Sequence, residues 1–147
     1  MVNLSLKFWA RQLLWSRLKP SLEECDRNNF NKSAIVFAPH EDDETLGCGG
    51  TIVKKKQAGA DVKIVFMTDG SGSHSQLISA NELKSMRAKE GIAAAGVLGL
   101  QPSEVSFLEF VDGNLSQSRS LAIAKVKSIL ERDRPAEIFI PYYRDVI

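Results

Sequence analysis

Five consecutive residues, His40 to Glu44, bring one imidazole and four carboxylates together in a single short segment. The segment directly follows an apolar run, residues 34–38, which predicts a buried strand. Carboxylates packed this closely repel one another, and desolvation strengthens the repulsion, so a bound cation would stabilise them. The imidazole favours zinc or a similar transition metal over calcium or magnesium. One carboxylate would bind the metal while a neighbour stays free as a base, which is the division of roles that metal-assisted hydrolysis requires.

Two other interpretations of this region stay open. Acidic residues are favourable at helix N-termini, so the segment is also compatible with a solvated acidic loop, although the whole group at a strand's carboxyl end favours a site. The second alternative is a non-catalytic Rossmann-like module that binds a nucleotide or a sugar. Gly47 and Gly49 match part of a dinucleotide fingerprint, but Ile52 stands at the third glycine position and the nearby acids would repel a pyrophosphate.

The elements that must position these residues alternate along the chain. Apolar runs predict strands at 34–38, 62–67, 105–108 and 137–140, and helical patterns cover 49–58, 81–98 and 118–131. This alternation predicts an α/β, Rossmann-like three-layer fold with a mainly parallel sheet. Ligands of such folds bind outside the carboxyl ends of the strands. That rule selects the loops 39–50, 68–75 and 109–114 and the segment from 141 onward. The Lys54-Lys55-Lys56 run is expected to form a solvated helix face.

The 147 residues divide into two predicted parts: an N-terminal amphipathic helix and linker at 1–32, and an α/β domain at 33–147. Residues 4–18 combine an apolar face with basic charge, which predicts a helix on the domain core or, alternatively, one that contacts a membrane surface or a partner. A net charge of +1 argues against a dedicated nucleic-acid binder. Two cysteines exclude a disulfide scaffold and favour a cytoplasmic location, with membrane association as the alternative. The sequence leaves the oligomeric state open.

Residues 37–51, Phe-Ala-Pro-His-Glu-Asp-Asp-Glu-Thr-Leu-Gly-Cys-Gly-Gly-Thr, resemble the signature of the PIG-L/LmbE-like deacetylase family. The usual form reads Ala-His-Pro-Asp-Asp-Glu, whereas here Pro39 precedes the histidine and Glu41 follows it. Further motifs of the family follow in the same order. They are Thr68-Asp69-Gly70, a helix with Arg87 and Glu90, and Asp112-Gly113.

This resemblance implies a zinc-dependent N-deacetylase with a Rossmann-like fold, Fe²⁺ being the alternative metal. His40 and Asp43 would bind the metal, and Asp42 would be the general base that activates water. Asp112 would support the pocket, and Arg87 and Glu90 would form a buried pair. The implied substrate is a small N-acetylglucosamine-containing conjugate, which would release acetate and a free amine.

The resemblance also implies a third metal ligand, a histidine in a segment after the fourth strand. The sequence contains only two histidines, His40 and His74, and it ends at Ile147. We therefore expect the chain to be the N-terminal portion of the family domain, truncated at its C-terminal side. The alternative is a degenerate deacetylase that lacks the third ligand and binds a sugar or a partner without hydrolysis.

Overall fold

The computed structural model describes residues 29–72 and 78–141. The predicted helix at 4–18, His74 and the last six residues lie outside these ranges. The described elements are β1 (Ala34–Ala38), α2 (Asp43–Gln57), β2 (Val62–Thr68), α3 (Ala80–Val97), the 3₁₀ turn η3 (Pro102–Glu104), β3 (Val105–Phe110), the 3₁₀ turn η4 (Leu115–Ser118), α4 (Arg119–Asp133) and β4 (Glu137–Phe139). Within the described ranges, no helix is both long and apolar enough to cross a membrane.

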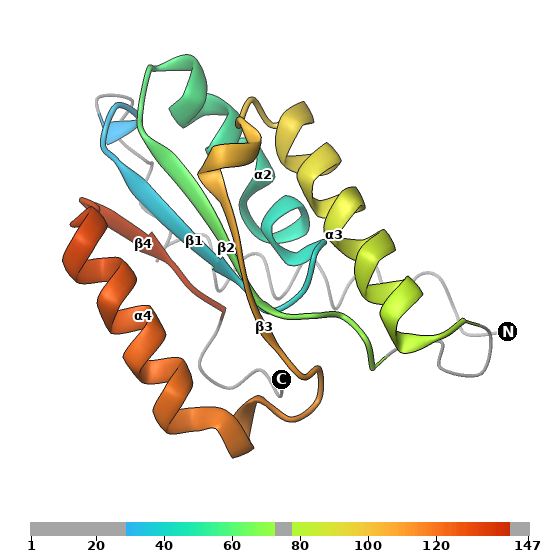
Figure 1. The fold of residues 1–147 in the computed structure, drawn as a ribbon. Helices are drawn as coiled ribbons and strands as arrows, with labels where there is room; N and C mark the ends of the chain where they lie inside the picture. Colours follow the sequence, from blue (N-terminus) through green and yellow to red (C-terminus); the bar gives the residue numbers. More distant parts are fainter. Residues whose placement is uncertain (1–28, 73–77, 142–147) are drawn as a thin grey trace, which may run out of the picture.

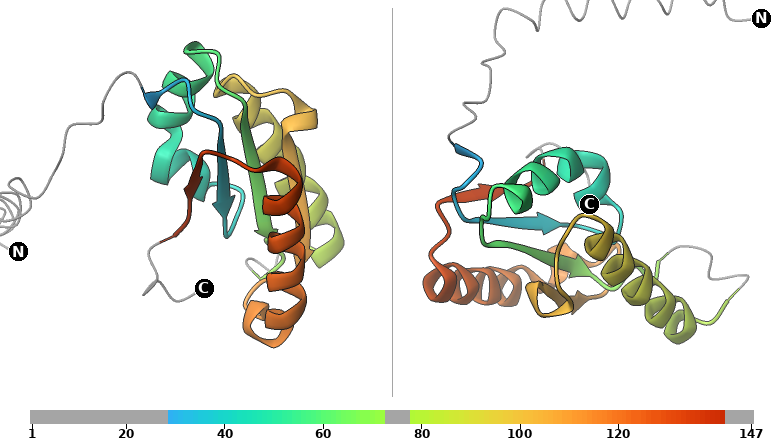
Figure 2. Two further views of the ribbon diagram at one scale, coloured as in Figure 1. Left: turned by 90° about the vertical axis from the view of Figure 1, so that its left-hand side faces the viewer. Right: turned by 90° about the horizontal axis from the view of Figure 1, so that it is seen from above.

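The strands form one parallel sheet in the order β3-β2-β1-β4, which confirms the predicted α/β architecture. Helices α2 and α4 lie on opposite sides of the strands (Figures 1 and 2). Because β2 pairs with one side of β1 and β4 with the other, the direction of strand succession reverses at β1. Open parallel sheets form their ligand crevice at such a reversal, outside the carboxyl ends of the strands.

The core has two halves, one on each face of the sheet, and β1 contributes to both. Val36 packs with Ile52 of α2 and Ala95 of α3 on one face. Ile35, its neighbour in sequence, packs with Ile129 of α4 on the other. Every residue of β1 is buried, which explains why this strand is a continuous apolar run rather than an alternating one.

Helix α2 begins at Asp43, six residues before the predicted start at Gly49. The predicted boundary was wrong because the acidic segment was assigned to a loop, whereas Asp43 and Glu44 occupy the first helical turn. Carboxylates at this position are favourable because they face the positive end of the helix dipole. The helix is distorted at Cys48, where φ is −146°. The segment from His40 to Glu44 therefore lies at the junction of β1 and α2, and only its last two residues are helical.

The lysine run of α2 also differs from the prediction of a solvated face. The Lys55 side chain is only 2% exposed. Its Nζ donates hydrogen bonds to the carbonyl oxygens of Asn29 (3.3 Å) and Lys32 (2.9 Å), and it forms an ion pair with Glu137 of β4. Lys55 thus connects α2 to the segment before β1 and to the edge strand.

Candidate metal and active site

The predicted site loops meet at the carboxyl edge of the sheet. His40 follows β1 and Asp112 follows β3, while β2 lies between these strands. At the end of β2, the backbone N–H (3.0 Å) and the hydroxyl (2.9 Å) of Thr68 both donate to the Pro39 carbonyl oxygen. This fixes the exit of β1 beside the exit of β2. Residues 72 positions apart, His40 and Asp112, are consequently in direct contact.

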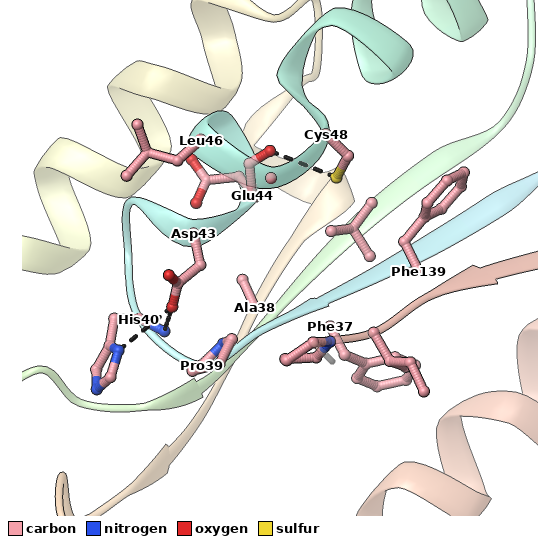
Figure 3. Close-up of a pocket in the computed structure, with 13 residues that line it drawn as sticks. Phe37, Ala38, Pro39, His40, Asp43, Glu44, Leu46, Cys48 and Phe139 are labelled. Atoms are coloured by element: carbon pink, nitrogen blue, oxygen red, sulfur yellow. Dashed lines mark hydrogen bonds and ion pairs between the residues drawn. The ribbon is translucent and has the colours of Figure 1, made fainter. Parts of the chain in front are cut away.

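The His40 ring lies between two carboxylates. Its Nδ1 is 3.3 Å from Asp43 Oδ2, the contact drawn in Figure 3, and its Nε2 is 2.9 Å from Asp112 Oδ1. The His40 backbone N–H also donates to Asp43 Oδ2 at 3.0 Å. Burial would lower the pKa of His40, but the hydrogen bonds and charges of Asp112 and Asp43 outweigh it and raise the pKa above its ordinary value. A neutral imidazole has one N–H and can donate to only one of these carboxylates, whereas a protonated ring, or a metal at one nitrogen, would satisfy both contacts.

The geometry of His40 and Asp43 suits zinc. Two ligands of a tetrahedral zinc ion, each bound at about 2.0–2.2 Å, are separated by roughly 3.3 Å, and the Nδ1–Oδ2 separation is 3.3 Å. Asp112 on the far ring nitrogen matches the carboxylate that commonly orients a metal-binding histidine. Within residues 29–72 and 78–141, no group of three potential ligands converges. The described residues therefore hold two members of the expected ligand set.

Asp42, the expected general base, stands beside this pair with its side chain exposed. It occupies the N-cap position of α2, where an aspartate ordinarily accepts a hydrogen bond from the first turn. Its φ of −144° and ψ of −19° are accompanied by no such side-chain bond. The helix thus leaves the Asp42 carboxylate free to accept a proton.

The two glutamates of the motif are buried, which the sequence did not predict. Glu41 is 5% exposed and Glu44, seen in Figure 3, is 1% exposed. Thr45 Oγ1 donates to Glu44 Oε1 at 2.7 Å, but Oε2 of each glutamate has no hydrogen-bond partner among the described residues. Burial raises the pKa of Glu41, and the attraction of Arg87 opposes this rise. The four acids of the motif therefore have different environments although they are adjacent in sequence.

The expected buried pair of Arg87 and Glu90 is wrong. Glu90 is exposed, and the ion pairs formed by the described residues do not include these two side chains. Arg87 instead lies beside Gly70: a β-carbon placed on Gly70 would be 3.3 Å from Arg87 Cγ and 2.7 Å from Glu41 Oε2. Position 90 of α3 is exposed, whereas Arg87 attracts the charge of Glu41 without an ion pair between the two side chains among the described residues.

An open pocket of about 590 Å³ borders the metal-site residues, between the start of α2 and β4 (Figure 3). His40, Asp43 and Glu44 contribute its polar wall, and most of the remaining lining is apolar. That lining consists of Val36, Phe37, Ala38, Pro39, Leu46, Gly47, Cys48, Phe139, Ile140 and Pro141. Burial and the nearby charge of Glu44 raise the pKa of the Cys48 thiol, which disfavours its use as a nucleophile.

A family model described as GlcNAc-PI de-N-acetylase (PIG-L) matches residues 35–146. The diacetylchitobiose deacetylase of Thermococcus kodakarensis is 32% identical over 114 residues, which cover 77% of this chain and 42% of that protein. The inhibitor-bound structure of the N,N'-diacetylchitobiose deacetylase from Pyrococcus horikoshii superposes with a TM-score of 0.68. That comparison gives 29% identity over 98% of this chain and 54% of the other.

The fold is also shared with a protein of different activity. GalB, the 4-carboxy-2-hydroxymuconate hydratase of Pseudomonas putida KT2440, has a TM-score of 0.63 at 24% identity, over 73% of this chain and 45% of the other. That likeness concerns the fold alone. The chain spans about half the length of the relatives it matches.

Proposed function

Because the chain belongs to the GlcNAc-PI de-N-acetylase (PIG-L) family, we propose that it carries the metal-binding and base residues of a metal-dependent N-deacetylase. The substrate is a small conjugate that contains N-acetylglucosamine, and the products are acetate and a free amine. One observation carries this proposal: His40 and Asp43 present a nitrogen and an oxygen 3.3 Å apart, while Asp112 holds the other side of the His40 ring. The diacetylchitobiose deacetylases among the relatives support the substrate class.

The residues have separate roles in this reaction. His40 and Asp43 would hold zinc, or Fe²⁺, which the same nitrogen and oxygen donors accept. Such a metal polarises a carbonyl oxygen and makes water a stronger acid. Asp42 accepts the proton of the water that attacks the acetamide carbonyl and passes a proton to the departing amine nitrogen. Asp112 orients the His40 ring through Nε2.

The substitution Asp42→Asn tests the assignment of the base. With zinc and N,N'-diacetylchitobiose present, we expect kcat for acetate release to fall by about 100-fold or more, while zinc content by elemental analysis stays unchanged. Asp61→Asn is the matched control, because Asp61 is exposed at the opposite end of β2 and should leave kcat unaltered. Full activity of Asp42→Asn would show that Asp42 is not the general base.

The alternative is a degenerate member that binds the sugar without hydrolysis. It predicts binding of N,N'-diacetylchitobiose with no acetate release, and affinity that Asp42→Asn does not change. A nucleotide-binding module predicts nucleotide affinity that survives replacement of both His40 and Asp43. Membrane or partner contact through residues 4–18, the division at residue 32 and a cytoplasmic location stay predictions.

A further inference from the structure

Asp69, at the end of β2, connects two of the site loops through one oxygen atom. Its Oδ1 accepts hydrogen bonds from the Ser71 backbone N–H (3.2 Å), the Ser71 hydroxyl (2.7 Å) and the Asp112 backbone N–H (3.2 Å). The Asp69 backbone N–H donates in turn to the Phe110 carbonyl oxygen at 2.9 Å. Burial would raise the pKa of Asp69, but these hydrogen bonds outweigh it and lower the pKa. Asp69 thus accepts hydrogen bonds from both loops, the one that follows β2 and the one that follows β3.

An irregularity in β3 makes this connection necessary. Phe66 pairs with Phe107, and Thr68 then pairs with Phe110, so β3 contains one residue more than β2 over this stretch. Glu109 accommodates the extra residue with a positive φ of 57°. A bulge of this kind redirects the residues that follow it, and a non-glycine residue with positive φ is under strain. The segment after β3 therefore needs contacts outside the strand ladder to hold one conformation.

The hydrogen bonds of Asp69 determine the position of Asp112. Its Oδ1 meets His40 Nε2 at 2.9 Å, and its Oδ2 accepts the Gly72 backbone N–H at 3.1 Å. A β-carbon on Gly72 would lie 2.7 Å from that Oδ2, so a larger residue at this position would displace the Asp112 carboxylate. Asp69 fixes Asp112 by two routes, directly through the Asp112 N–H and indirectly through the turn from Ser71 to Gly72.

We propose that Asp69 is a positioning residue of the metal site, which sets the orientation and tautomer of His40 through Asp112. A carboxylate can only accept, and Asp112 lies closer to the His40 ring (2.9 Å from Nε2) than Asp43 does (3.3 Å from Nδ1). In a neutral ring the hydrogen is therefore favoured on Nε2. Nδ1, which faces Asp43, is then left as the nitrogen available for a metal. The inference rests on the proposed function in treating His40 as a metal ligand, whereas the hydrogen bonds it describes join side chains and backbone groups of this chain alone.

Two substitutions distinguish the effect of the position of Asp69 Oδ1 from the effect of the carboxylate charge. Asp69→Asn removes the charge and keeps an acceptor at the same place. Asp69→Glu keeps the charge and moves the acceptor by one methylene group. Asp61→Glu is the matched control on the exposed opposite end of β2. The probe is the pair of ring ¹⁵N signals of His40 in the metal-free chain at alkaline pH, where the imidazole is neutral. The chain has two histidines, and His74→Gln assigns the signals.

We expect the wild-type chain, Asp69→Asn and the control to show the Nε2–H tautomer. Asp69→Glu should show averaged ring signals and bind zinc about 10-fold or more weakly in competition with a chromophoric chelator. A wild-type His40 pattern in folded Asp69→Glu would overturn the proposal. Altered His40 ring signals in Asp69→Asn would also overturn the proposal. This second measurement tests the proposal even if Asp69→Glu does not fold.

The spectroscopic result is independent of catalysis. If Asp42→Asn retains full activity, the assigned base is wrong but the tautomer preference of His40 stands. If the tautomer does not respond to Asp69, the positioning role is wrong and the deacetylase proposal is unaffected.

Discussion

Carboxylates that are adjacent in the sequence have opposite environments in this site. Asp42 is exposed, whereas Glu41 and Glu44 are buried. The sequence predicts a cluster of acids but not which of them faces water, because that depends on where α2 begins. A helix that starts at Asp43 turns successive side chains by about 100°. Neighbouring acids thereby have different exposures: Asp42 is exposed, Asp43 is half-buried and the two glutamates are buried.

The first prediction concerns the charge opposite Glu41. Arg87→Met should lower the free energy of unfolding by roughly 2 kcal/mol, because it leaves the buried Glu41 carboxylate without its nearby cation. Glu41→Gln in the same chain should recover most of this loss. Urea unfolding of the two single variants and the double variant measures the coupling.

Glu90→Gln is the control for this cycle. Glu90 is exposed on α3, so its substitution should change stability by less than about 0.5 kcal/mol. A larger effect of Glu90→Gln than of Glu41→Gln in the Arg87→Met background would restore the sequence-based pairing of Arg87 with Glu90.

At the scale of elements, α2 is attached at both ends. Its first turn carries Asp43, one of the two proposed metal ligands. Its last turn carries Lys55, which contacts β4 and the segment that precedes β1. The run of three lysines predicts a solvated face because lysine is rarely buried without a partner. The partners are two backbone carbonyls and a residue more than 80 positions away, none of which a local pattern contains.

Lys55→Met tests this attachment. The substitution preserves most of the side-chain volume but leaves the carbonyl oxygens and Glu137 without their donor. We expect a loss of about 2–3 kcal/mol of unfolding free energy, somewhat below the loss for a fully buried pair because Glu137 is partly exposed. Lys89→Met, at an exposed position of α3, should change stability by less than about 0.5 kcal/mol. Equal effects would show that Lys55 contributes no more than a surface lysine.

For the whole molecule, the sequence predicts the order and type of the elements because strand and helix periodicities are local and strongly expressed here. It also predicts that the loops that carry His40 and Asp112 lie at one edge of the sheet, since both loops follow strands of one parallel sheet. The bulge at Glu109 and the hydrogen bonds of Asp69 could not be predicted. They depend on strand register, which is fixed only when β2 and β3 pair.

Zinc should stabilise the folded chain if His40 and Asp43 bind it. A ligand at 100 times its dissociation constant adds about 2.7 kcal/mol, which corresponds to a rise in Tm of several degrees. Thermal unfolding with increasing zinc should show this rise in the wild-type chain and not in His40→Ala. A similar rise in His40→Ala would place the zinc elsewhere.

The position of β3 at the edge of the sheet has a consequence for how the site opens. Asp112 follows this strand, and among the described strands β3 pairs with β2 alone. Segments with fewer pairing contacts open at lower free energy, so brief detachment of β3 would separate Asp112 from His40 Nε2. Amide hydrogen exchange in β3 and disorder of the His40 ring should therefore be two signs of a single opening event.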